Sequence, residues 1–581
     1  MVKLGMRSFW RDNMVYNIRD FIKDVKNATP AFVEAISLMQ SGDTLIIGNG
    51  KYDMRVEGAL VKHYYISNND HGIKPIALPI IGKENISIIG EGAELVFHGE
   101  ILPVVVDSSK NIKLSGFSID YEVPMYAQCD VIETSEDRTV IKFDGKQFWC
   151  RVDEDGNWCF YSESPDWKWE RHRRSDVITL EFDKEGKPCH YSIPYFPHTG
   201  GYEDHGFLDC MYREVELEQL GENLIAMKGN TGVKHTVGHT LVMTWNTREF
   251  PGIFTTDSDD VEYTDIMLYH TMAMGFITQN TSNITFRRLA CAPRRDKGRL
   301  LSVTCDATHF VNCRGYIEIA DCNFEYMMDD AANIHGNYHV YEKQLDADTI
   351  LVQFGHFQQK GANIYRVGDT VNIIDAYTMD IHGEAKVVGF EVISADNMIL
   401  KLDRAVEAPE EWWVVENIST APDIHIHDTN CGYNRTRGFL LSSRGKVVIE
   451  RNRFHNYNHG VQLSGELRDW YESGAALDVT IRDNDFTNSA YAGGSAIYSN
   501  PKLEATKTNK DLIYNGKLVV EGNHFEQADK RMLWVEHSES VIFKNNTFRK
   551  NEDYPRHAPH NEKGILCEHC GSADIEDAKE I

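Results

Sequence analysis

The chain has 581 residues, and its 88 acidic and 60 basic side chains give a formal net charge of −28. Such an acidic surface repels phosphate backbones and anionic membranes, so neither a nucleic-acid nor a membrane partner is expected. The sequence contains no apolar run of about 18 residues, the length that a membrane span needs, and none of signal-peptide length at its start. It therefore predicts a cytoplasmic protein, or a secreted one if the sequence has been trimmed.

The N-terminal region predicts a helix followed by a strand. Apolar residues recur at helical spacing from Ala31 to Met39, and Thr29 and Pro30 form a suitable helix start. A short strand is expected at Asp43–Ile47. An amphipathic helix at this place would cover the open end of a repeat fold, whose terminal units need a cap.

One pattern recurs along most of the chain: alternating apolar positions, a polar turn, and then Asn-x-Phe. Neighbouring copies start 22 to 39 residues apart. A period in the twenties made of short β-rich pieces is typical of a β-helix, whose coils stack because none can bury its apolar face alone. The clearest copies start at Lys446, Asp478, Lys517 and Ser540, and looser copies at Glu84, Lys110, Val261, Asn283 and Tyr316.

Stacking of these copies predicts two ladders of identical residues. The asparagines would line up at one corner, where they satisfy the turn backbone, and the phenylalanines would stack inside. A β-sandwich or β-propeller with fortuitous similarity between strands is the competing interpretation. The ladder residues are Asn452, Asn484, Asn523 and Asn546, with Phe454, Phe486, Phe525 and Phe548.

Two stretches without the repeat alternate like antiparallel strands and are predicted to be inserted domains. The expected fold is all-β: a right-handed parallel β-helix with two inserted antiparallel β-barrel-like subdomains and an N-terminal capping helix. The expected parts are the cap and first coils (1–129), the first insertion (130–245), the central coils (246–337), the second insertion (338–420), the C-terminal coils (421–555) and a C-terminal tail (556–581).

The densest polar cluster lies in the central coils. Asp306 and Asp329 are 23 residues apart, about one coil, so their carboxylates are expected to stack in adjacent coils. Two carboxylates that close cannot both ionise easily, so the pKa of one should rise, as an acid–base pair requires. Asp329 and Asp330 would face opposite sides of a regular strand, so they can share a site only if the chain bulges or turns there.

Other polar residues around this cluster are predicted to bind substrate. The imidazoles can hydrogen-bond sugar hydroxyls or serve a structural role, and the arginine can bind an acidic group or pair with the carboxylates. The segment Phe196–Asp209, rich in turn-forming residues, is a candidate lid. The expected substrate-binding residues are His309, Glu325, Asn333, His335 and Arg295.

The segment DDAANIHG from Asp329, TCDATHF one coil earlier and the two insertions resemble glycoside hydrolase family 110. That family consists of exo-acting α-1,3-galactosidases, which release terminal galactose from blood-group-B-type and related glycans with inversion. The resemblance implies that Asp306, Asp329 and Asp330 are the catalytic residues, with Asp329 as general acid and the others activating water. It also implies an oligosaccharide substrate with terminal α-galactose, a homodimer, and no metal or cofactor.

Inverting glycosidases separate acid and base by roughly 6.5–9.5 Å to admit the attacking water. The three carboxylates are therefore not expected to be in tight mutual contact.

Two other functions fit a β-helix. One is a polygalacturonase-like hydrolase or a lyase, but the Gly-His-Gly and Arg-Ile-Lys strings typical of the former are absent, and the central cluster is poor in lysine. The other is a non-catalytic carbohydrate-binding or structural protein, which would lack a concentrated acidic cluster.

Overall fold

The computed structural model describes residues 13–581 except 175–176, 190–214, 230–233, 246, 408–411, 492 and 555–562. The candidate lid Phe196–Asp209 lies outside the described residues. Within them, no helix has both the length and the apolar character needed to cross a membrane.

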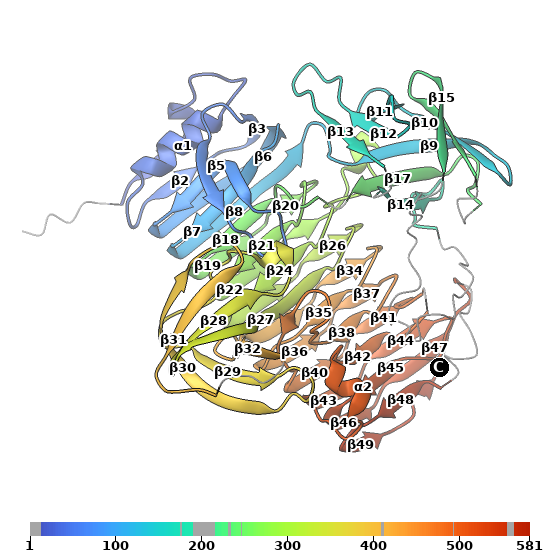
Figure 1. The fold of residues 1–581 in the computed structure, drawn as a ribbon. Coiled ribbons are helices and arrows are strands. Elements are labelled where there is room, and N and C mark those ends of the chain that lie inside the picture. Colours follow the sequence, from blue (N-terminus) through green and yellow to red (C-terminus); the bar gives the residue numbers. More distant parts are fainter. Residues whose placement is uncertain are drawn as a thin grey trace, which may run out of the picture.

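Parallel strands stacked coil upon coil form most of the protein (Figure 1). One sheet of 23 strands, called sheet one here, contains two strands from nearly every coil. One group of strands is β1 (Val15–Asn17), β2 (Thr44–Ile46), β3 (Gly50–Arg55), β6 (Glu84–His98), β8 (Lys110–Tyr121), β19 (Asp259–Thr264), β22 (Ser282–Arg287), β25 (Arg314–Ala320), β33 (Asp423–His427), β36 (Lys446–Glu450), β40 (Asp478–Arg482), β43 (Asn515–Glu521), β46 (Ser538–Lys544) and β49 (Ser572–Ile575). The other strands of sheet one are β20 (Met267–Leu268), β23 (Ala290–Cys291), β26 (Asn323–Glu325), β34 (Asn430–Gly432), β37 (Arg453–His455), β41 (Asp485–Thr487), β44 (His524–Gln527), β47 (Thr547–Lys550) and β50 (Lys579–Glu580).

The remaining strand of each coil belongs to a second sheet, called sheet two here. Its members also pair in parallel with the equivalent strand of the next coil. They are β5 (Gly72–Ile81), β7 (Leu102–Asp107), β18 (Ile253–Thr256), β21 (Phe276–Gln279), β24 (Thr308–Val311), β27 (Ala332–Asp346), β35 (Phe439–Leu441), β38 (Val461–Leu463), β42 (Ile497–Ser499), β45 (Leu533–Glu536) and β48 (Ile565–Glu568).

The helix α1 (Thr29–Leu38) lies at the N-terminal end of the stack (Figure 1). Pro30 stands in its first turn, and Phe32, Ala35 and Ile36 are buried. The helix packs against β5 and β3 of the first coils. The predicted N-terminal capping helix is therefore confirmed.

The predicted asparagine ladder is present at one corner. The backbone N–H of Asn452 donates to Asn484 Oδ1 at 2.9 Å, that of Asn484 to Asn523 Oδ1 at 3.0 Å, and that of Asn523 to Asn546 Oδ1 at 2.8 Å. Each side-chain amide also donates to a backbone carbonyl, as Asn484 Nδ2 does to Ile449 O at 3.0 Å. The ladder thus satisfies the buried polar groups of the turn.

The predicted phenylalanine ladder is present inside the coils. The ring centroids of Phe454 and Phe486 are 4.7 Å apart and those of Phe486 and Phe525 4.9 Å apart, with nearly parallel planes. Phe548 is the register partner of Phe525 in the following coil. Such stacked aromatic pairs add to the stability that burial alone gives.

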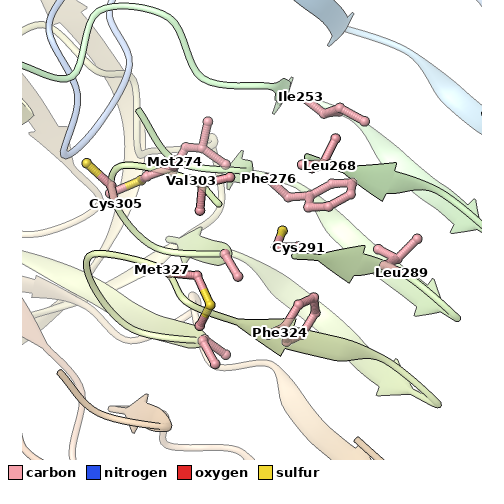
Figure 2. Close-up of a cluster of buried hydrophobic side chains, with 14 of the residues drawn as sticks. Ile253, Leu268, Met274, Phe276, Leu289, Cys291, Val303, Cys305, Phe324 and Met327 are labelled. Atoms are coloured by element: carbon pink, nitrogen blue, oxygen red, sulfur yellow. The ribbon is translucent and has the colours of Figure 1, made fainter. Parts of the chain in front are cut away.

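The coils that precede the phenylalanine ladder in the chain are filled by aliphatic, aromatic and sulfur-containing side chains (Figure 2). Leu268, Phe276, Leu289, Cys291 and Phe324 lie close together in this core and are fully buried. The described cysteines are all free.

The first insertion leaves the coils at β9 and returns after β17. Among the described residues it contains a six-stranded antiparallel sheet, in the order β14-β17-β9-β10-β16-β15, and a three-stranded sheet, β11-β12-β13. The bounds are β9 (Ala127–Thr134), β10 (Arg138–Phe143), β11 (Trp149–Val152), β12 (Trp158–Tyr161), β13 (Glu170–Arg173), β14 (Val177–Phe182), β15 (Glu216–Gly221), β16 (Leu224–Lys228) and β17 (Thr240–Trp245).

The second insertion is a closed antiparallel barrel. Its strands pair in the circuit β27-β28-β31-β30-β29-β32 and back to β27. Strand β27 therefore begins as a rung of sheet two and continues as a barrel strand. The bounds are β28 (Thr349–Phe354), β29 (Thr370–Asp375), β30 (Ile381–Val392), β31 (Asn397–Leu402) and β32 (Trp413–Asn417).

Residues 556–581 were expected to form a C-terminal tail, and this prediction is wrong for the residues that the structure describes. Strands β48, β49 and β50 pair in parallel with β45, β46 and β47, so the segment adds one more coil. This coil lacks the Asn-x-Phe ending by which the other coils were recognised. The coil pairs there because it covers the apolar edge of the preceding coil, which would otherwise be exposed.

We expect Asn484→Ala to lower the thermal unfolding midpoint measurably. The substitution leaves the buried N–H of Asn452 without its acceptor, which costs about 1–3 kcal/mol. Differential scanning fluorimetry measures the effect, with the exposed Lys517→Ala on the adjacent strand β43 as control. Equal midpoints for the two variants would contradict a stabilising ladder.

Candidate active site

The predicted acidic residues lie on the turns that lead into the strands of sheet two. Asp306 precedes β24 by two residues and Asp330 precedes β27 by two. Arg437 stands at the same place before β35. Because Thr308 pairs with Ala332 and Ala332 with Phe439, these three residues occupy one column in successive coils.

This register corrects the expected pairing. The residue stacked next to Asp306 is Asp330, 24 positions later, whereas a partner 23 positions later, Asp329, was predicted. Asp329 and Asp330 lie on a turn between β26 and β27, and Tyr326 at its start has a φ of 59°. The chain is irregular there, as predicted, so both carboxylates reach the same site.

The carboxylates open into a cavity of about 240 Å³. Its floor and walls come from strands of sheet two together with turns and loops, and nearly all its lining side chains are polar or charged. They are Asn68, Arg248, Asp306, His309, Asp329, Asp330, Asn333, Arg437, Leu440, Gln462, Ser464, Glu466, Asp469, Trp470, Glu472 and Lys502.

A chain of hydrogen bonds runs from Asp306 into the protein. Asp306 Oδ2 lies 2.5 Å from His309 Nδ1, His309 Nε2 lies 3.0 Å from His335 Nε2, and His335 Nδ1 lies 2.7 Å from the carbonyl oxygen of Gly336. A carbonyl only accepts, so His335 Nδ1 carries a proton, and in a neutral ring its Nε2 accepts from His309. His309 Nδ1 then holds a lone pair, so Asp306 is the donor.

The electrostatic surroundings agree with a protonated Asp306. Burial raises the pKa of Asp306 well above its ordinary value, and the neighbouring charge of Asp329 raises it further. Burial holds the pKa of His309 well below its ordinary value. Both shifts favour a neutral acid hydrogen-bonded to a neutral imidazole.

Asp330 is held by Arg437 through both of its oxygens. Arg437 Nε lies 2.9 Å from Oδ1 and Nη2 lies 2.9 Å from Oδ2, while the backbone N–H of Arg437 also donates to Oδ1 at 3.1 Å. Burial raises the pKa of Asp330 to about 7, against the opposing charge of Arg437. Asp330 therefore can gain or lose a proton near neutral pH.

Asp329 is the most accessible of the three, with 20% of its side chain exposed. Burial raises its pKa, but the charges of Arg248, Arg437 and Arg435 outweigh that effect, so the pKa of Asp329 lies below its ordinary value. Thr436 Oγ1 lies 3.0 Å from Asp329 Oδ1 and 2.7 Å from Asp330 Oδ1. The shared hydroxyl brings these two carboxylates to one point of the cavity.

The expectation that the three carboxylates are not in tight contact is wrong. One oxygen of each lies within 4.8 Å of the others. Stacking brings Asp306 beside Asp330, and Arg437 and Arg248 supply the positive charge that makes the crowding tolerable. The cluster has the ligand type for a hard cation, but these two guanidinium groups already balance its charge.

The structure also places the predicted substrate-binding residues. Asn333 and His309 line the cavity, and His335 lies behind His309. Glu325 does not reach it, because it faces the outside of sheet one and accepts from Asn430 at 3.0 Å. Arg295 does not reach it either, since its guanidinium lies 4.3 Å above the ring of Tyr326.

Several site residues were missed by the sequence analysis. Arg437 occupies the same column as the aspartates, whereas Arg248 and Trp470 come from loops and Glu472 from the two-residue strand β39 (Glu472–Ser473), none of which carries a repeat signal. The guanidinium of Arg248 lies 5.1 Å from the ring centroid of Trp470, and Glu472 Oε1 lies 3.4 Å from Asn333 Nδ2. His356 of the barrel packs against Trp470 with centroids 4.1 Å apart. The second insertion thus supports one wall of the cavity.

Comparisons with known proteins agree with this architecture. Residues 414–579 match the family model of a right-handed β-helix region, which confirms the predicted hand. Residues 349–411 match the model of the GLAA-B β-barrel domain II.

Curated relatives align along nearly the whole chain. Alpha-1,3-galactosidase B of Phocaeicola vulgatus is 30% identical over 597 residues, covering 95% of this chain and 92% of that protein. Alpha-1,3-galactosidase A of Shewanella woodyi is 29% identical over 554 residues, covering 91% of this chain and 84% of that protein. Alpha-1,3-galactosidase B of Bacteroides thetaiotaomicron is 29% identical over 568 residues, covering 95% and 88%. The chain belongs to the α-1,3-galactosidase family, glycoside hydrolase family 110.

Proposed function

We propose that this protein is an exo-acting α-galactosidase that hydrolyses terminal α-1,3-linked galactose from oligosaccharides or glycans. The observation that carries the proposal is the opposite protonation preference of Asp306 and Asp329 within one polar cavity. Glycoside hydrolysis needs a carboxylic acid that donates a proton and a carboxylate that accepts one. Membership of the family supplies the substrate class.

Asp306 is the proposed general acid, and Asp329 with Asp330 the proposed base. This differs from the role of general acid expected for Asp329, because the charge of Arg248 keeps Asp329 ionised while burial keeps Asp306 protonated. The O–H of Asp306 donates to His309 Nδ1 in the structure, so it must turn toward the glycosidic oxygen before its proton passes there, as the bond of that oxygen to the anomeric carbon breaks. Water then adds to the anomeric carbon, and its proton passes to Asp329 or Asp330.

The shape and polarity of the cavity favour the removal of a single terminal sugar. Asn68 bounds it from the N-terminal coils and Lys502 from the C-terminal coils, so the described residues close the cavity at both ends along the helix axis. Among the described residues, buried Asn333 Oδ1 and Arg248 Nε have no hydrogen-bond partner. A sugar hydroxyl, which both donates and accepts, satisfies such groups.

Inversion is proposed on the basis of the family resemblance. The close spacing of the three carboxylates departs from the separation of roughly 6.5–9.5 Å usual for inverting enzymes. All three have both oxygens engaged in hydrogen bonds with protein groups. Asp329 is the most accessible of them, and we propose that it holds a water molecule together with Asp330 and does not attack the sugar itself.

We expect Asp306→Asn and Asp329→Asn each to lower kcat about 100- to 10,000-fold on an α-1,3-linked digalactoside. Each change removes a proton donor or acceptor while keeping the side-chain shape. Released galactose is the readout. Glu325→Gln, outside the cavity, is the matched control and should retain wild-type activity. Full activity of Asp306→Asn would remove Asp306 from catalysis.

We expect β-galactose to appear first when proton NMR follows the hydrolysis of an α-1,3-linked digalactoside. Water that adds from the face opposite the leaving group inverts the anomeric centre. Initial α-galactose would contradict inversion and would make Asp329 the candidate nucleophile.

We expect Asp306→Asn to gain stability relative to the wild type as the pH rises from about 4, near the pKa of an unfolded Asp, to neutral pH. The raised pKa of Asp306 means that folded protein keeps a proton which the unfolded chain, with an Asp pKa of about 3.9, has lost. Wild-type stability therefore falls as pH rises through this window, whereas the carboxamide of the variant does not titrate. Thermal unfolding midpoints across the window measure the difference between the two proteins, and a difference independent of pH would contradict the raised pKa.

A further inference from the structure

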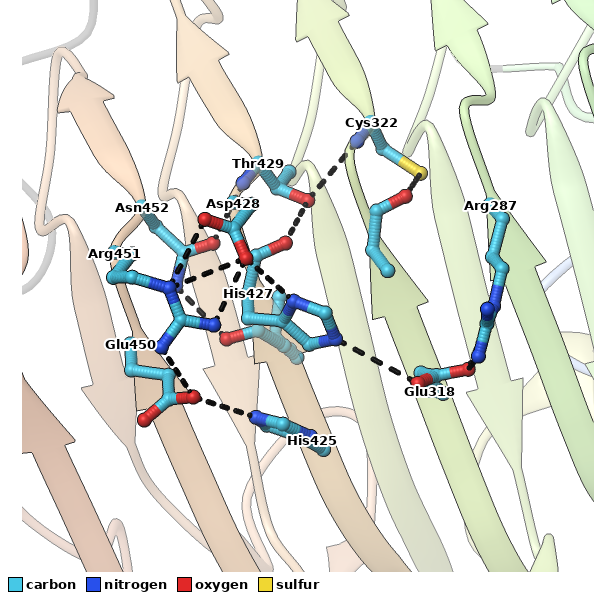
Figure 3. Close-up of polar contacts among 12 residues, drawn as sticks. Arg287, Glu318, Cys322, His425, His427, Asp428, Thr429, Glu450, Arg451 and Asn452 are labelled. Carbon is cyan, nitrogen blue, oxygen red and sulfur yellow. Dashed lines mark hydrogen bonds and ion pairs between the residues drawn. The ribbon is translucent and has the colours of Figure 1, made fainter.

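A second cluster of chemically competent side chains lies on the outer face of sheet one, where β25, β33 and β36 run side by side (Figure 3). Glu318 on β25 is the register partner of His425 on β33. His427 lies two positions further along β33 and projects from the same face. The three residues belong to no wall of the catalytic cavity.

The spacing of these side chains suits one small cation. One nitrogen of His425, one of His427 and one oxygen of Glu318 all lie within 4.8 Å of one another. His427 Nε2 is 3.6 Å from Glu318 Oε1. Two ligands of a tetrahedral zinc ion are about 3.4 Å apart, given metal–ligand bonds of about 2.1 Å.

The contacts behind the three side chains orient them as ligands are oriented in metal sites. His427 Nδ1 lies 2.7 Å from Asp428 Oδ2, and His425 Nδ1 lies 3.3 Å from the hydroxyl of Tyr316. Both contacts involve the Nδ1 atom of the histidine. In His427 the other ring nitrogen, Nε2, faces Glu318. A carboxylate behind a histidine ligand fixes the ring and raises its basicity.

One carboxylate oxygen of Glu318 is available to bind a metal ion. Its Oε2 accepts from Arg287 Nε at 3.0 Å and from Arg287 Nη2 at 2.6 Å. Oε1, the oxygen nearest His427, takes no part in this fork. Arg287 thus holds the carboxylate in place without occupying the ligand atom.

A second carboxylate stands at the edge of the cluster. Glu450 Oε1 lies 3.2 Å from His425 Nε2, and Arg451 and Arg482 also pair with Glu450. Glu450 or water can complete a four-coordinate ion. Side-chain exposures of 28% for His425, 17% for His427 and 13% for Glu318 leave the face open to an incoming ion.

We propose that Glu318, His425 and His427 bind one zinc ion on the outer face of sheet one. Two imidazoles and a carboxylate, with an open fourth position, form a donor set that zinc prefers. The ion would link β25 to β33, rungs whose paired residues lie more than 100 positions apart because the barrel intervenes. Its role would be to stabilise this junction, since a ligand that binds only the folded state raises stability.

Zinc binding to metal-free protein tests the proposal. Competition with a chromophoric chelator gives the number of bound zinc ions, and visible spectra of the Co²⁺-loaded protein report the coordination geometry. His425→Ala, His427→Ala and Glu318→Gln should each bind one zinc fewer than the wild type. The test compares variants with the wild type because another cluster of donor atoms can also bind zinc and add to the total number of bound ions. That cluster consists of Glu181, Cys189 and His239.

The matched control is His524→Ala, a histidine of sheet one whose Nε2 faces Glu526 Oε2 at 3.7 Å. It should bind as many zinc ions as the wild type. Zinc should also raise the thermal unfolding midpoint of wild type and control by more than it raises that of the three site variants. Galactose release by the metal-free variants checks that they are folded. Equal zinc stoichiometry in wild type and site variants would overturn the proposal.

Discussion

Parallel in-register pairing sets equivalent residues of successive coils above one another, about 4.8 Å apart. In the core this constraint stacks Phe454 on Phe486, and at one corner it stacks Asn452 on Asn484. At the turns before sheet two the same constraint brings Asp306 beside Asp330. Two carboxylates this close repel each other in a buried place. The column therefore continues with a guanidinium, that of Arg437, while Asp306 keeps a proton.

Much of the fold could be predicted from the sequence because successive coils use the same residue types at the same places. An asparagine that caps a turn and a phenylalanine that fills the next inward position leave a visible signature, as at Asn484 and Phe486. The last coil was missed because Ile565–Glu568 pairs through backbone and apolar edge alone. The closing of the barrel depends on pairing between β27 and β32, a contact with no local signal.

Only some residues of the candidate site could be predicted from the sequence. Asp306, Asp329 and Asp330 were found because the acids are dense and lie one coil apart. Arg437 occupies the next place in their column, but the barrel separates it in sequence, so counting residues from Asp330 does not reach it. Aligning the residue two places before each strand of sheet two would have found it. Trp470 lies on a loop, and Glu472 lies on the two-residue strand β39 (Glu472–Ser473), which pairs with β27 across the inserted barrel. Glu325 faces outward because it follows the buried Phe324 on strand β26.

The ion pair between Asp330 and Arg437 spans 107 residues, and the whole barrel lies between its partners. At a synthesis rate of about 5–20 residues per second, the acidic turn leaves the ribosome roughly 5–20 seconds before its counter-charge. Until then the nascent chain ends in an exposed rung at β27 with unpaired backbone groups. The barrel, built on the continuation of that strand, brings the following coil back to the same edge. The catalytic column can therefore be completed only after the whole barrel has been synthesised.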